Sequence, residues 1–189
     1  MPLPANALIS IDTARAWIPG LSAMADPDLE RMIGGASATA DRLTGRALAA
    51  QDHVVTIHGS GRRELKVPHY PVQTITDVRI DAGGVFGPET VVIDYDADLP
   101  TGFLYRRSGW PDGWRNVRVD MRAGYEIDGA PEDLQAAVAE VIEWMSRRVQ
   151  EQAIGIRTIT SPDGINTAFD LDVPMAARNV FKAYREVYL

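Results

Sequence analysis

The chain has 189 residues, of which 46% are hydrophobic and 24% charged, so it is long enough to bury the core of a folded domain. Its formal net charge of −7 argues against non-specific binding to nucleic acid. The absence of cysteine excludes disulfides, thiolate catalysis and cysteine-ligated zinc. No apolar run approaches the ~20 residues that span a bilayer, and the first residues lack the pattern of a signal peptide, so we expect a soluble, cytoplasmic protein without membrane contact.

Two helices are expected near the N-terminus. The first covers about residues 13–18, where Ser10 or Asp12 can cap it. The second covers about residues 27–43, and Asp26 offers a capping carboxylate at its start.

Small residues distinguish the second helix. Gly34 and Gly35 lie in its middle and would let another backbone approach closely. Gly45 follows the last periodic apolar residue, so we expect it to end the helix as a C-cap.

The character of the sequence changes after residue 50, where short alternating segments are separated by turn residues. Consecutive short strands of this kind favour antiparallel pairing in a small sheet or barrel. Gly59, Ser60 and Gly61 predict the tip of a hairpin between the first two strands, and the spacing of Val72 and Ile75 predicts a β-bulge. The expected strands cover residues 53–58, 64–67, 72–80, 90–95, 102–106 and 117–123.

Helical periodicity returns at Pro131 and continues to about residue 151. Trp144 widens the apolar stripe of this long helix beyond what one core contact needs. Residues 156–161 and 165–169 predict a second hairpin or an extended arm, and a short last helix follows Pro174. The expected fold class is therefore α+β: a helical body formed by residues 1–50 and 126–189, with a β insertion at residues 51–125.

The candidate metal sites in the sequence are weak. Asp94, Asp96 and Asp98 alternate like the start of a calcium loop, but Leu99 stands where that loop needs glycine, and Tyr105 stands where it needs glutamate. The three histidines, His53, His58 and His69, do not have the helical spacing of a zinc site. With no catalytic motif recognised either, we expect no catalytic residue, no metal and no cofactor.

Two loops carry side chains that suit recognition. Trp110 and Trp114 flank a tight turn, where tryptophans stack on sugars, anchor an interface or fold over the end of a sheet. Arg62 and Arg63 follow the expected hairpin tip and could contact a DNA phosphate or a carboxylate of a partner. The chain also ends on apolar residues, which dock either on the protein's own core or in a groove of a partner.

Four stretches of the sequence occur together in one known family. The sequence resembles the head–tail connector (adaptor) proteins of tailed bacteriophages and of phage-derived particles such as gene transfer agents. The stretches that carry the resemblance are a helix that ends in T-G-R at residues 29–46, the strand region at 65–80, the strand end V-R-V-D-M-R-A-G-Y at 117–125 and the helix start P-E-D-L at 131–141.

The resemblance implies a non-enzymatic structural protein of the virion neck, present in the host cytoplasm during assembly. It implies a ring, usually of twelve copies, that lies under the portal protein and meets a stopper or tail-completion protein. DNA would pass through the lumen without sequence-specific binding. The implied portal contacts are Phe181, Tyr184, Tyr188 and Leu189; the candidates for contacts between subunits are Gly34, Gly35, Trp110, Trp114 and Trp144. A chain without residues 176–189 is expected to fold but not to join heads to tails.

Two other functions remain open on the sequence alone. One is a small β-domain enzyme or carbohydrate-binding module that uses the loop of Trp110 and Trp114. The other is an assembly chaperone that is absent from the finished virion.

Overall fold

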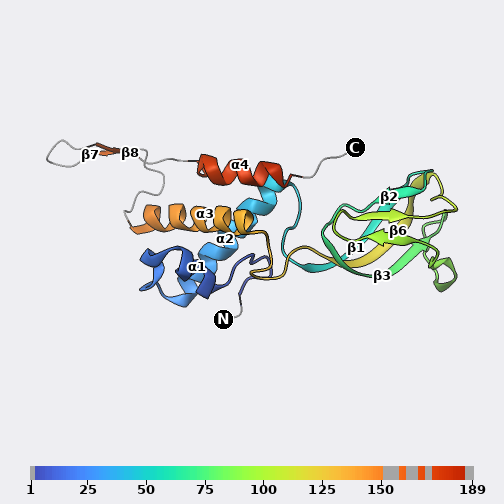
Figure 1. Ribbon diagram of the computed structural model, residues 1–189, viewed down its shortest axis with the longest axis horizontal. Coiled ribbons are helices and arrows are strands. Elements are labelled where there is room, and N and C mark those ends of the chain that lie inside the picture. Colours follow the sequence, from blue (N-terminus) through green and yellow to red (C-terminus); the bar gives the residue numbers. More distant parts are fainter. Residues whose placement is uncertain (1–2, 151–157, 161–165, 169–171, 186–189) are drawn as a thin grey trace. The chain divides into compact units, whose positions relative to one another are not determined.

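The computed structural model describes residues 3–150, 158–160, 166–168 and 172–185. The chain forms two compact units (Figure 1). One unit contains residues 1–46 and 126–189 and is mostly helical, and the other contains residues 47–125 and is built from β-strands.

The helical unit is organised around its long C-terminal helix. Helix α3 (Glu132–Gln150) contacts α1 (Ile11–Trp17), α2 (Asp26–Thr44) and α4 (Met175–Ala183). A 3-10 turn, η1 (Pro19–Leu21), connects α1 with α2. The buried positions of α3 are Leu134, Ala137, Val138, Ala139, Val141, Ile142 and Ser146. The wide apolar stripe predicted for this helix is therefore covered mainly by other helices of the same chain.

The helix ends follow the sequence with one correction. Ser10 caps α1, because its Oγ accepts a hydrogen bond from the Thr13 amide at 3.1 Å. Gly45 ends α2 in the left-handed conformation, with a φ of 76°. Asp26 was predicted to cap α2, but the N-cap is Ala25. The Asp26 carboxylate instead pairs with the Arg15 guanidinium at 2.7 Å, and this links the start of α2 to α1.

The β unit contains two antiparallel sheets of three strands. The larger sheet has the order β1 (Gln51–Gly59), β6 (Gly113–Ala123), β3 (Val72–Ile80). The smaller sheet has the order β2 (Glu64–Lys66), β5 (Phe103–Tyr105), β4 (Asp96–Asp98). Both sheets contribute to one apolar core, formed by Leu65, Val67, Val72, Val78, Val92, Leu104, Trp110, Val117, Val119, Met121 and Ala123. The α+β fold class is confirmed, and the described strands of the β unit form two sheets and no closed barrel.

Two local predictions in the β unit are wrong. The turn at residues 59–61 does not join a hairpin, because β1 pairs with β6 and β2 pairs with β5. The side-chain oxygen of Asn116 on β6 accepts a hydrogen bond from the Gly59 amide at 2.7 Å and holds the end of β1. The chain then crosses from the larger sheet to β2 in the smaller one. No strand forms at 90–95: Thr90 ends a 3-10 turn, η2 (Pro88–Thr90), Val91 makes only an isolated bridge to Arg79, and the paired strand begins at Asp96.

Two other predictions are confirmed. Strand β3 shifts its register against β6 twice, between Val72 and Thr74 and between Ile75 and Asp77, so it contains the predicted irregularity. The second hairpin is present, with β7 (Thr158–Thr160) antiparallel to β8 (Asn166–Ala168).

Gly124 closes the end of β6 and provides a test of this packing. Its φ is 110°, and an added Cβ would lie 2.4 Å from the carbonyl oxygen of Ala49. We therefore expect Gly124→Ala to lower the free energy of unfolding of the β unit by at least about 2 kcal/mol, measured by urea unfolding. Gly20→Ala is the matched control, because an added Cβ there meets no atom within 4 Å. Equal stability of the two variants would contradict the placement of Gly124.

Candidate functional site

The small residues of α2 are used inside the helical unit. A Cβ at Gly34 would lie 3.0 Å from Cγ of Pro4, and the Asn6 side chain donates to the Gly34 carbonyl at 3.1 Å. A Cβ at Gly35 would lie 3.6 Å from Cε of Met145 on α3. The close approach that the glycines permit is thus made by the N-terminal segment and by α3 of the same chain, and these two residues are weak candidates for contacts between subunits.

The described part of the C-terminal helix also belongs to the core. Phe181 is completely buried, and Tyr184 is half-buried. The Tyr184 hydroxyl donates to Asp133 at 2.7 Å, and its carbonyl accepts from Arg46 Nε at 3.3 Å. Phe181 therefore cannot contact a portal while α4 is packed.

This packing corrects the expectation for a truncated chain. Loss of residues 176–189 would remove Phe181 and Ala177 from the core, so we expect the truncated chain to be strongly destabilised. Tyr188 and Leu189, the other two predicted portal contacts, lie outside the described residues.

An apolar groove lies between the first half of α2 and the end of α3. Its volume is about 570 Å³. The apolar lining residues are Met24, Met32, Trp144, Met145 and Val149, and the charged ones are Asp28, Arg31 and Arg148. The Arg148 guanidinium lies 4.9 Å from the centre of the Trp144 ring, within range of a cation–π interaction. Flexible methionines beside an aromatic ring and arginines are the composition of many protein-binding surfaces.

The two loop tryptophans have different environments. Trp110 is buried, and its indole N–H donates to the Leu104 carbonyl at 3.1 Å, so it packs at the end of the smaller sheet. Trp114 is 81% exposed, with its ring 4.1 Å from that of His58. Because only one of the two rings is accessible, they do not form a shared platform for a sugar.

Arg62 and Arg63 are exposed on a fixed backbone. The Arg62 carbonyl accepts from the Trp110 amide at 2.7 Å, and the Arg63 carbonyl accepts from the Arg106 amide at 2.8 Å. In the described part of the chain, neither guanidinium forms an ion pair. Both charges are therefore available to a partner.

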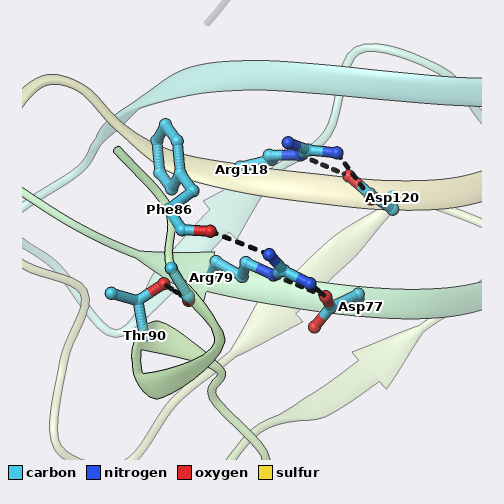
Figure 2. Close-up of polar contacts among 7 residues, drawn as sticks. Asp77, Arg79, Phe86, Thr90, Arg118 and Asp120 are labelled. Carbon is cyan, nitrogen blue, oxygen red and sulfur yellow. Dashed lines mark hydrogen bonds and ion pairs between the residues drawn. The ribbon is translucent and has the colours of Figure 1, made fainter. Parts of the chain in front are cut away.

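A group of four charges lies on the larger sheet (Figure 2). Arg79 on β3 is opposite Arg118 on β6, and Asp77 is opposite Asp120. Like charges opposite each other destabilise a strand pair. Each arginine therefore pairs along its own strand, Arg79 with Asp77 at 2.6 Å and Arg118 with Asp120 at 2.8 Å. The Asp120 carboxylate raises the pKa of the Arg118 guanidinium.

Arg79 also holds the loop that follows β3. Its guanidinium donates to the Phe86 carbonyl at 2.8 Å (Figure 2). The Asp81 carboxylate accepts from the amides of Gly83 at 2.7 Å and of Phe86 and Val85 at 2.9 Å, and these bonds lower the pKa of Asp81. Val85 is 83% exposed on this ordered loop.

The loop forms one side of a second groove, of about 500 Å³. Trp114 and Arg118 also line it, together with Val54 and Thr56 of β1. The sequence did not indicate that residues 82–84 line a groove with Trp114, because that arrangement joins segments far apart in the chain. The described residues contain no cluster of histidine, aspartate or glutamate that could hold a metal ion.

The described surface thus contains two grooves and several exposed side chains that suit contact with other proteins. A family model described as head completion protein matches residues 7–187. The chain belongs to this family. The predicted resemblance is confirmed, and the protein is a structural head–tail connector of a virion.

Solved structures confirm the fold. The chain is similar, with 20% identity and a TM-score of 0.61, to a chain in the neck of an empty gene transfer agent particle computed with C6 symmetry. It is also similar to chains in the neck of the native particle computed with C12 symmetry, at 21% identity and a TM-score of 0.57, and in the virion of the native particle, at 22% and 0.59. Each similarity covers 100% of this chain and 94% of the other. The comparison with curated proteins found no match. None of the described helices is long and apolar enough to cross a membrane.

The loop held by Arg79 gives a test of the β-unit surface. We expect Arg79→Met to increase the hydrogen-exchange rates of the Val85 and Phe86 amides about tenfold, because it removes the bond to the Phe86 carbonyl and leaves Asp77 unpaired. Arg107→Met removes the same charge from an exposed position and is the control. Unchanged exchange in the Arg79 variant would show that the loop is held by other contacts.

Proposed function

We propose that this connector forms a ring in the neck of a tailed phage or gene transfer agent, between the portal and a stopper or tail-completion protein. The match of the family model to residues 7–187 carries the proposal, because it includes both units. The structurally similar chains come from necks computed with C6 and C12 symmetry, and this supports a cyclic arrangement of copies. In this role the protein holds components together and has no enzymatic activity.

The distribution of charge suits a protein that surrounds DNA. The residues of the helical unit include sixteen acidic and ten basic side chains, whereas those of the β unit include ten acidic and nine basic ones. The net charge of the protein therefore belongs almost entirely to the helical unit. An acidic wall repels phosphate, so the helical unit would let DNA pass through the lumen without binding it.

In the proposed ring, the accessible groove, the exposed side chains of the β unit and the C-terminal residues each contact a different partner. The groove around Trp144 contacts the next copy in the ring, since its apolar lining is available on the folded subunit. Trp114, Arg62 and Arg63 contact neighbouring virion proteins from the β unit, and the two arginines pair there with carboxylates or with DNA phosphates. The chain end after Arg185, which includes Tyr188 and Leu189, reaches the portal.

The groove gives the sharpest test of ring formation. We expect Trp144→Ala to lower the free energy of unfolding by about 2 kcal/mol and to leave the subunit folded, because the side chain is only partly buried. We expect the same variant to reduce the number of copies retained in purified particles, measured by quantitative mass spectrometry against the portal. Trp17→Ala is the matched control, because Trp17 is a 49% exposed tryptophan of the same unit outside the groove.

Two results would contradict the proposal. Full retention of the Trp144 variant would exclude the groove from the contact between copies. Absence of the wild-type protein from finished particles would indicate an assembly chaperone and exclude the neck ring.

A further inference from the structure

Strand β1 has a regular backbone edge that no described strand covers. It is the outer strand of the larger sheet, and its only strand partner among the described elements is β6. The pairing with β6 is continuous from Gln51 to Ile57, so the opposite edge presents an equally regular row of amide and carbonyl groups. Val54, in the middle of this row, is 64% exposed.

The other edge of the same sheet is protected. Strand β3 has two register shifts, and its edge is partly covered by a bridge between Arg79 and Val91 and by a hydrogen bond from the Val92 amide to the Val78 carbonyl at 2.8 Å. Natural proteins blunt exposed edges with bulges, lysine, proline or a covering segment. The sequence of β1, Q-D-H-V-V-T-I-H-G, contains no lysine and no proline, and its only carboxylate is Asp52. An edge left open in this way is typical of a strand that pairs with another chain.

A second β element of this chain also has open edges. Strands β7 and β8 have three residues each, and within the described part of the chain they pair with each other and with no further strand. An isolated hairpin of two strands is at best marginally stable in water. The strand sequences, T-I-T and N-T-A, are uncharged, and threonine and isoleucine favour extended structure. The hairpin therefore suits addition to a larger sheet.

We infer that the β7–β8 hairpin of one copy adds to the β1 edge of the next copy, so that a five-stranded sheet crosses the boundary between subunits. This inference rests on the proposed ring. Every copy supplies one hairpin and one open β1 edge, so head-to-tail pairing around a closed ring covers every β1 edge and places every hairpin in a larger sheet. The main-chain hydrogen bonds fix the register of neighbouring copies, while the groove around Trp144 supplies apolar contact area.

The absence of cysteine makes a direct test possible. Two single variants, Val54→Cys and Ile159→Cys, are coexpressed so that one particle contains both, and the particles are then oxidised. Residues opposite each other on paired strands have Cβ atoms about 5 Å apart, close to the range that a disulfide needs. We expect disulfide-linked dimers that contain one copy of each variant. The control pairs Ile159→Cys with Thr76→Cys, an exposed position on the protected strand β3, and should give no dimer.

A second pair of variants measures how much the strand pairing contributes to association of the copies. Val54→Lys places a charge on the open edge, and Ile159→Pro removes an amide from the hairpin. We expect each to weaken association of the copies by roughly ten- to a hundredfold, the effect of losing one or two net backbone hydrogen bonds, with unchanged unfolding of the isolated subunit.

The outcomes separate the inference from the proposed function. A normal number of copies in the particle without the disulfide between positions 54 and 159 would overturn the strand pairing and leave the ring intact. A disulfide from Val54→Cys to a cysteine of another virion protein would also overturn it, because the edge would then belong to a different partner. Loss of the wild-type chain from the particle would overturn the ring itself.

Discussion

The structure depends on the burial of α3 by helices of its own chain. An amphipathic helix with so wide an apolar face must be covered, and α1, α2 and α4 do this within one subunit. Phe181 completes the cover from the C-terminal side, and the Tyr184 hydroxyl fixes α4 to Asp133 at the start of α3. Because these apolar faces are used internally, the proposed contacts between copies must use what remains accessible on a folded subunit.

What remains accessible is limited and specific. In the helical unit it includes the groove lined by Trp144 and the methionines of α2 and α3. In the β unit it includes Trp114, the ordered loop that carries Val85, and the open edge of β1. The β unit has its own core, with both sheets contributing, so these features are presented on a framework that does not need a partner in order to fold. A connector subunit built in this way can fold before it joins an assembling particle.

Features fixed by neighbouring residues in the chain could be predicted from the sequence. Ser10 caps α1 through a hydrogen bond from the Thr13 amide, three residues further along the chain, and Gly45 ends α2. The apolar face of α3 follows from the spacing of its own side chains. Contacts between distant segments could not be predicted. The alternation of β1 and β2 does not tell which strands they pair with, and the sequence around Gly34 does not reveal that Pro4 occupies the space beside it. The environments of Trp110 and Trp114 differ for the same reason, since the loop conformation buries one ring and exposes the other. The function was predicted from a family resemblance, because connectors have no catalytic chemistry that a motif could indicate.

The central claim is that each subunit is complete without its neighbours, and thermal unfolding of the purified chain at increasing protein concentration tests it most directly. A self-contained subunit should sediment as a monomer at low concentration and unfold at temperatures that do not depend on concentration. An unfolding temperature that rises steadily with concentration, together with loss of helical circular dichroism on dilution, would contradict the claim, because α3 would then require helices from another copy.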